Sequence, residues 1–120
     1  MESQDVRNAI SGIRVVDKPV GRTSHDVVET IRKGTNIRRA GHTGTLDPRA
    51  SGVLVVLVGP AVRLSEFVSA ADKRYQAIIK LGGATDTYDA DGRQMGQPGA
   101  TVNVTETQFT EALQHYVGEI

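Results

Sequence analysis

The residues best suited to chemistry lie together in one short segment, RAGHTGTLDPRASG, which spans residues 39–52. Its single carboxylate, Asp47, stands directly before Pro48, and a proline biases the preceding residue away from helical backbone toward an extended conformation. We therefore expect the Asp47 side chain at a defined position, where an ionised carboxylate can act as a nucleophile or as a base. Gly41 and Gly44 leave room for a second backbone or a ligand to approach closely.

The neighbours of this carboxylate favour a polyanionic ligand. Arg38, Arg39 and Arg49 flank the turn with positive charge, which attracts a polyanion and keeps a nearby carboxylate ionised. His42 and Thr43 add groups that can form hydrogen bonds or stack. The alternative is an ordinary Asp-Pro turn with flexible glycines that leads into a strand, and the residues alone leave both interpretations open.

The charge of the whole chain is zero, but it is unevenly distributed. Residues 1–80 hold 13 of the 14 Lys and Arg and 8 of the 14 Asp and Glu, a net charge of +5, whereas residues 81–120 carry −5. The first part could therefore face a polyanion while the acidic remainder faces elsewhere, although scattered surface charge would look the same.

Other kinds of site have little support. The acidic run DTYDADG (86–92) fits a calcium loop poorly, because Thr87 and Pro98 stand where its first and last acidic ligands belong. The segment around the turn contains neither GxxxxGK[ST] nor GxGxxG, which are phosphate- and dinucleotide-binding motifs. The three histidines lack ligand spacing, so we expect no metal site. Ser24 and Ser51 lack a nucleophile elbow, which argues against a serine hydrolase.

These residues need a scaffold, and 120 residues suffice for one domain with a modest core. Strands and helices mix without regular βαβ order, which predicts an α+β fold with a mixed β-sheet and flanking helices. Strands are expected at GIRVVDKP (12–19), VLVVLVG (53–59) and KRYQAIIKLG (73–82), and helices at TSHDVVETIRKG (23–34), AVRLSEFVSA (61–70) and after Thr105.

Local signals support these elements. The continuous apolar run VLVVLVG predicts a strand buried on both faces, and the alternation in KRYQAIIKLG predicts a half-buried strand. Capping boxes pair Thr23 with Asp26 and Thr105 with Gln108, and Gly34 is expected to end the first helix. A loop rich in Gly, Asp and Pro is expected from residue 82 to about residue 99. The last helix carries one apolar stripe, formed by Phe109, Ala112, Leu113, Tyr116 and Val117.

Nothing in the sequence directs the chain to a membrane. Residues 1–11 form a polar leader without the basic and apolar regions of a secretory signal. The longest apolar run, residues 53–58, is far too short to span a bilayer. We therefore expect a soluble, cytoplasmic protein.

Three stretches of the chain resemble a known family. DKPVGRTSHDVV (17–28), RRAGHTGTLDPRASGVLVVLVGPAVRL (38–64) and KRYQAIIKLGGATDTYDADG (73–92) resemble, in order and spacing, the tRNA pseudouridine-55 synthases of the TruB family. The resemblance covers roughly residues 12–92, and the following helix also fits. It is specific, because the glycines, the histidine and the Asp-Pro pair of GHTGTLDP occur together.

The resemblance implies a definite reaction. Such enzymes isomerise uridine 55 in the T arm of tRNA to pseudouridine without a cofactor, after flipping the base out of its stack. The family's essential aspartate matches Asp47, which would either attack covalently or deprotonate the sugar while the glycosidic bond breaks.

The same match assigns supporting roles. Tyr75 would stack on the flipped base and could transfer a proton, although without the family match a tyrosine on an alternating strand is more often a core residue. His42 would pack in the loop that enters the T arm and help to hold the opened stem. Lys18 and Pro19 match the family's KPxG motif, which supports the active-site loop. Arg38 and Arg39 would contact phosphates.

Members of the family are more than twice this length. The resemblance therefore implies that residues 12–120 form the N-terminal portion of a pseudouridine synthase catalytic domain. Further strands, a basic partner for Asp47, an apolar pocket wall and a C-terminal RNA-binding domain would lie elsewhere. Besides tRNA, the expected partner is either that C-terminal half or a second copy joined through an open sheet edge. The rival functions are a non-catalytic RNA-binding or tRNA-chaperone fragment and a purely structural domain.

Overall fold

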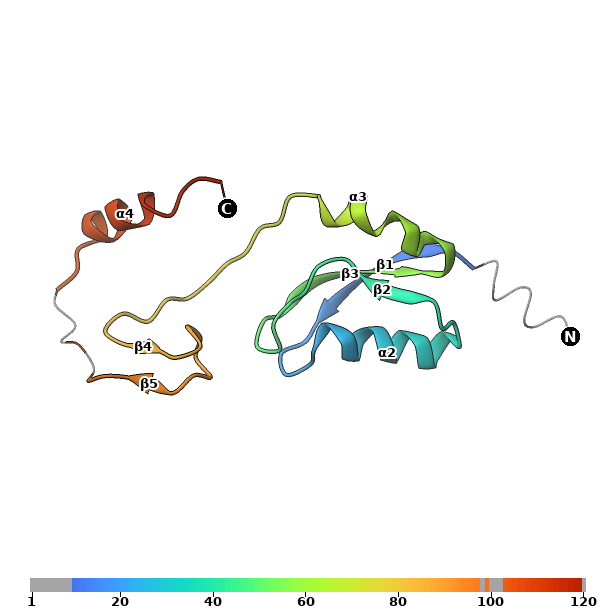
Figure 1. The fold of residues 1–120 in the computed structure, drawn as a ribbon, viewed down its shortest axis with the longest axis horizontal. Helices are drawn as coiled ribbons and strands as arrows, with labels where there is room; N and C mark the ends of the chain where they lie inside the picture. Colours follow the sequence, from blue (N-terminus) through green and yellow to red (C-terminus); the bar gives the residue numbers. More distant parts are fainter. Residues whose placement is uncertain (1–9, 98, 100–102, 120) are drawn as a thin grey trace, which may run out of the picture. The chain divides into compact units, whose positions relative to one another are not determined.

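The computed structural model describes residues 10–97, 99 and 103–119 (Figure 1). The chain divides into two compact units, residues 1–74 and 75–120. The predicted leader falls mostly on residues 1–9, which lie outside the described residues.

The first unit is built on a three-stranded antiparallel sheet. Its strands are β1 (Gly12–Lys18), β2 (Ala40–His42) and β3 (Gly52–Val58), in the spatial order β1-β3-β2. The helix α2 (Ser24–Thr35) lies against one face of this sheet, and the 3₁₀ helix η1 (Gly59–Leu64) and the short helix α3 (Ser65–Ser69) follow β3 on the other side (Figure 1). The α+β class is confirmed.

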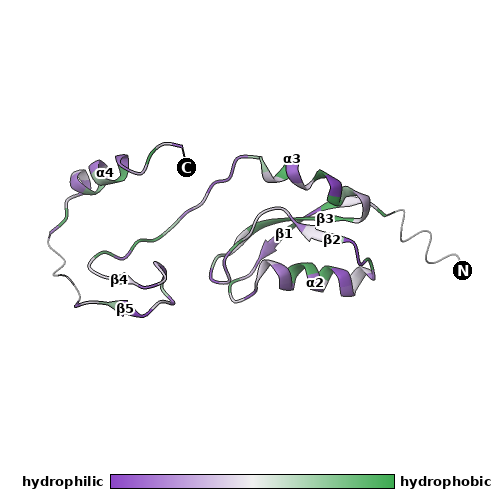
Figure 2. Ribbon diagram, viewed as in Figure 1, coloured by the Kyte–Doolittle hydropathy of each residue, from purple (hydrophilic) through white to green (hydrophobic). Residues whose placement is uncertain are grey.

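The core lies between α2 and the central strand β3. Its buried apolar residues are Val27, Val28, Ile37, Ala40, Leu54, Val56 and Val58. Figure 2 shows β3 as hydrophobic along its length. The prediction of a strand buried on both faces is confirmed for its last three residues, whereas Val53 is 70 % exposed. The next residue, Leu54, is 2 % exposed and belongs to the core with Val27 and Val28 of α2. Because neighbouring residues of a strand point to opposite faces, Val53 lies on the face away from that core, which is open at this end of β3.

The helix α2 begins as the sequence predicts. Thr23 caps it, and the reciprocal hydrogen bonds of the capping box with Asp26 are both present. The predicted end at Gly34 is wrong by one residue, because the last residue of the helix is Thr35 and the C-cap is Asn36. Asn36 adopts a left-handed backbone with φ of 55°, which asparagine tolerates better than most residues.

The second unit contains a small hairpin and one helix. The strands β4 (Ala84–Thr85) and β5 (Gln94–Met95) pair within the segment that the sequence predicts as a loop. The helix α4 (Glu106–Gln114) starts at the predicted capping box of Thr105 and Gln108. It ends before Tyr116 and Val117, so the predicted apolar stripe extends beyond the helix.

The predicted strand at residues 73–82 is wrong. These residues form no strand, and Ile78 and Ile79 are 99 % and 61 % exposed. A strand is stable only when a neighbour accepts and donates its backbone hydrogen bonds, and none of the described strands pairs with this segment. The alternation of side chains fits a strand, but the described residues include no neighbouring strand with which this segment pairs.

No helix among the described residues is long and apolar enough to cross a membrane.

Candidate active site

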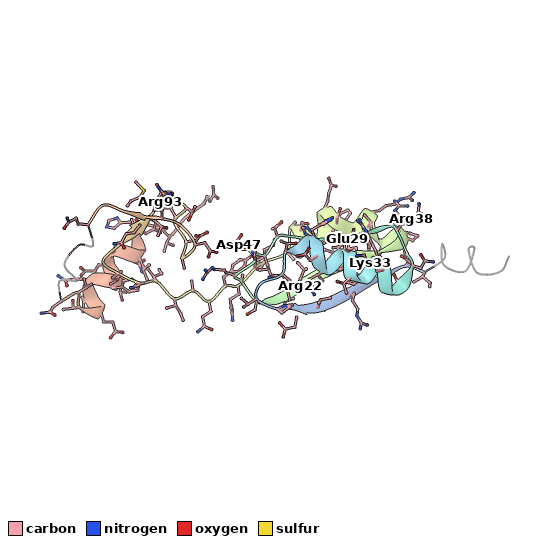
Figure 3. All side chains as sticks on the ribbon, turned by 90° about the horizontal axis from the view of Figure 1, so that it is seen from below. Arg22, Glu29, Lys33, Arg38, Asp47 and Arg93 are labelled. Carbon is pink, nitrogen blue, oxygen red and sulfur yellow. The ribbon has the colours of Figure 1, made fainter. Side chains whose placement is uncertain are left out.

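Asp47 is displayed on the turn that connects β2 to β3. The residue is exposed, and its carbonyl accepts a hydrogen bond of 2.9 Å from the Ala50 N–H, which closes the turn. Gly44, at the start of the turn, has a φ of +106° that side chains rarely permit. The carboxylate thus projects from a compact turn at one end of the first unit (Figure 3).

Lys18 anchors the turn just after Asp47. The Lys18 side chain is fully buried at the end of β1, and its ammonium donates to the carbonyls of Arg22 (2.6 Å), Pro19 (3.0 Å) and Pro48 (3.4 Å). The Gly21 N–H donates to the same Pro48 carbonyl at 2.7 Å. Residues 18–22 therefore form hydrogen bonds with the turn at Pro48, the residue that follows Asp47.

Ser24 anchors the turn just before Asp47. The Leu46 N–H donates to Ser24 Oγ at 2.9 Å, and the Ser24 hydroxyl lies 3.1 Å from the Leu46 carbonyl that accepts from it. The Leu46 side chain packs against the core. Sequence reasoning weighed Ser24 only as a nucleophile and missed this contact. One signal was available, since Ser24 shares the buried face of α2 with Val27 and Val28, where a polar residue needs a partner.

His42 lies at the end of β2, close to the same turn. Its Nδ1 is 2.9 Å from the Gly44 carbonyl oxygen. A carbonyl can only accept, so Nδ1 carries the proton in this contact and Nε2 is the ring nitrogen left for another partner. The Lys73 side chain, which follows α3 in the sequence, lies close to the turn. A Cβ atom placed on Gly44 would be 3.3 Å from Lys73 Cε.

The arginine pair lies away from the carboxylate. Arg38 and Arg39 are exposed residues that follow α2, whereas the N-terminal end of α2 contacts the Asp47 turn through Ser24. A twelve-residue helix is about 18 Å long. Figure 3 shows Arg38 and Asp47 at opposite ends of α2, with Arg22 toward the Asp47 end. The sequence led us to expect the pair beside the turn, and it did not single out Arg22.

The remaining predicted residue, Tyr75, opens the second unit and is 66 % exposed. Its role as the residue that stacks on the base stays a prediction.

A carboxyl group at the start of α2 has a shifted pKa. The Thr23 backbone N–H and the Thr23 hydroxyl both form hydrogen bonds with Asp26, and these bonds lower the pKa of the Asp26 carboxyl, with smaller contributions from Arg22 and His25. Within the described ranges, no group of three or more His, Asp or Glu side chains is placed to hold a metal ion.

Comparison with known proteins places the chain in a family context. Residues 32–120 match the model of the TruB family pseudouridylate synthase (N terminal domain). A tRNA pseudouridine synthase B of Mannheimia succiniciproducens is 43 % identical over 111 residues, which cover 92 % of this chain and 36 % of that protein. The protein of the same name from Azoarcus sp. is 42 % identical over 120 residues, covering 100 % of this chain and 39 % of its own. A third, from Opitutus terrae, is 40 % identical over 116 residues, covering 94 % and 46 %.

The chain thus spans between about a third and a half of these relatives. Among solved structures, a Cbf5-Nop10-Gar1 complex matches with a TM-score of 0.46 and 44 % identity, over 52 % of this chain and 18 % of the solved chain. An H/ACA RNP bound to a substrate RNA containing 2′-deoxyuridine matches with a TM-score of 0.47 and 43 % identity, over 52 % and 20 %.

Proposed function

Because the chain belongs to the TruB family of pseudouridylate synthases, we propose that it supplies the catalytic aspartate of an enzyme that converts uridine 55 in the T arm of tRNA to pseudouridine. The observation that carries this proposal is the exposed Asp47 carboxylate on a turn that is anchored on both sides, inside the segment matched by the family model. The name that the relatives share supports tRNA as the substrate.

In the proposed reaction, Asp47 acts on a flipped uridine. The bond between N1 of the base and C1′ of the sugar breaks, the base turns, and a bond forms between C5 and C1′. The proton on C5 leaves to solvent and N1 gains one, so that the product is an isomer of the substrate. Asp47 serves either as the nucleophile at C1′ or as the base that deprotonates the sugar, and both roles need the ionised carboxylate.

The other site residues hold the RNA in this proposal. His42 packs in the loop that enters the T arm and offers Nε2 to the opened stem, since Nδ1 is bound to the Gly44 carbonyl. Tyr75 stacks on the flipped base and takes part in proton transfer. Lys18 supports the turn through the Pro48 carbonyl. Arg38 and Arg39, which follow the far end of α2, contact phosphates away from the target nucleotide.

The test is tritium release from unmodified tRNA labelled at C5 of uridine, because the C5 proton is lost during isomerisation. The purified chain is compared with its Asp47→Asn variant, and circular dichroism checks that both are folded. Release by the wild-type chain alone supports the proposal. If neither protein releases tritium although both bind tRNA, the chain is the non-catalytic RNA-binding fragment. If neither binds tRNA in a salt-dependent way, a structural role remains.

The proposed protein partner is either the C-terminal half of a synthase or a second copy of the chain. In the sheet, β1 is an edge strand, and Ile13 and Val15 on it are exposed. Sedimentation of the chain alone distinguishes a monomer that awaits the other half from a self-associating protein.

A further inference from the structure

We propose that Ser24 is a positioning residue for Asp47, and that its hydroxyl sets the place of the carboxylate through the backbone of Leu46. This inference rests on the proposed function, since it is Asp47 that it serves. Ser24 itself lies at the first position of α2 and is 3 % exposed, so it does not meet the RNA.

One hydroxyl group holds two peptide planes. The Leu46 N–H belongs to the peptide that joins residues 45 and 46, and the Leu46 carbonyl belongs to the peptide that joins residues 46 and 47. Ser24 Oγ binds both, at 2.9 and 3.1 Å. The two bonds together restrict rotation about both backbone dihedrals of Leu46. The second plane contains the backbone nitrogen of Asp47, so the position of that residue is restricted as well.

The anchors before and after Asp47 are independent. On the far side, the Pro48 carbonyl is held by the Gly21 N–H at 2.7 Å and by Lys18. The proline ring fixes its own φ. Asp47 is the only residue between the two anchored ones. Removing the serine hydroxyl therefore frees one side of Asp47 while the other side stays in place.

The Ser24 hydroxyl stabilises the turn and is not needed to begin the helix. Ser24 shares the buried face of α2 with Val27 and Val28, where an alanine would pack and would favour the helix more than serine does. The helix end is capped by Thr23, whose backbone N–H and hydroxyl both form hydrogen bonds with Asp26. The hydrogen bonds to Leu46 are thus the specific contribution of this side chain.

Small displacements at this point matter for chemistry. A reacting carboxylate must lie within roughly 3–3.5 Å of its target atom, and a displacement of about 1 Å can lower the rate by about a hundredfold. Without the Ser24 hydroxyl, the Asp47 carboxylate is still present and exposed. Only the hydrogen bonds to the Pro48 carbonyl, after Asp47, then restrict its position. We therefore expect turnover to fall while RNA binding, which depends on other residues, is kept.

The test compares Ser24→Ala with Thr23→Ala, a matched control. Both variants remove one hydroxyl from adjacent residues at the start of α2, but the Ser24 hydroxyl binds Leu46 in the turn, whereas the Thr23 hydroxyl binds Asp26 in the helix. In Ser24→Ala we expect kcat for tritium release to fall about tenfold or more with KM within about twofold of wild type. The Leu46 amide should exchange its hydrogen at least about tenfold faster. In Thr23→Ala we expect a lower Tm with unchanged kcat and unchanged Leu46 exchange.

Two results would overturn the inference. One is an equal kcat in wild type and Ser24→Ala, and the other is an equal loss in both variants, which would reflect general loosening of the helix end. If the wild-type chain releases no tritium, the proposed function of this chain fails on its own. The Leu46 amide then decides about Ser24, because unchanged exchange in Ser24→Ala means that the hydroxyl does not hold the turn.

Discussion

At the scale of single residues, the turn that carries Asp47 is held by side chains that lie far from it in the sequence. The turn that carries Asp47 was predictable because its signal is local, in the glycines and the Asp-Pro pair of one short segment. Of the side chains that hold this turn, the family resemblance named Lys18, whereas Ser24 was missed. Their contacts join residues 30 and 22 positions apart, respectively. A sequence shows which residues could act, whereas contacts across the fold decide which residues hold them.

The pH dependence of stability is a prediction at the same scale. The hydrogen bonds from Thr23 lower the pKa of Asp26 in the folded chain, so the ionised carboxylate stabilises the fold above the unfolded pKa. This stabilisation is lost as the pH falls through the folded pKa. Asp26→Asn should therefore lower Tm at pH 7, and its difference from wild type should shrink as the pH falls below about 4.

Thermal unfolding followed by circular dichroism between pH 7 and about pH 2 measures this difference. The control is the same substitution in a Thr23→Ala background, where the difference at pH 7 should be smaller because the partner hydroxyl is gone. A gap in Tm that stays constant over the whole pH range would contradict the prediction.

At the scale of elements, the sequence predicted those that carry their own signals. The capping box of Thr23 and Asp26 located α2, and the apolar run located β3. The strand β2 has three residues, too few for any periodicity, and the paired strands β4 and β5 have two each. The strand expected at residues 73–82 failed because strand formation depends on a distant neighbour, which no local pattern reports.

Two glycines give opposite predictions for alanine substitution. Gly59, at the end of β3, has a φ of +64°, donates to the Arg39 carbonyl at 2.7 Å, and has the Ile10 carbonyl where a Cβ would lie. Gly59→Ala should lower the free energy of unfolding by roughly 2 kcal/mol or more. Gly34 is inside α2 with open space around its Cβ position, so Gly34→Ala should raise that free energy by up to about 1 kcal/mol.

Urea unfolding of the two variants beside wild type checks both signs in one experiment. Equal midpoints for Gly59→Ala and wild type would mean that the strand ends rearrange to admit a methyl group.

At the scale of the whole molecule, net charge is +5 over residues 1–80 and −5 over residues 81–120, and this distribution leads to a prediction about RNA binding. Affinity for tRNA should fall with salt, because bound cations on the RNA are released for each phosphate contacted. Replacing both Arg38 and Arg39 with Gln should reduce the slope of log K against log salt by about 2. Asp47→Asn should leave that slope unchanged.

Arg93 offers a matched control for this measurement. It is the only Lys or Arg in residues 81–120, which carry a net charge of −5, and its backbone N–H donates to Asp86. Arg93→Gln should leave the salt slope unchanged, because the surrounding carboxylates disfavour a phosphate there. Filter binding across a range of salt concentrations gives all the slopes, and an unchanged slope in the double arginine variant would place the RNA elsewhere.

Because Lys18 is buried, its chemical reactivity reports how often the turn opens. Its amine is enclosed by three carbonyl groups, so an acylating reagent can reach it only while the turn is open. Lys33 is exposed on α2 and serves as the reference amine. The ratio of the two labelling rates, read by mass spectrometry, gives the fraction of time that the turn is open. The same reading in the presence of tRNA measures how far the bound RNA closes it.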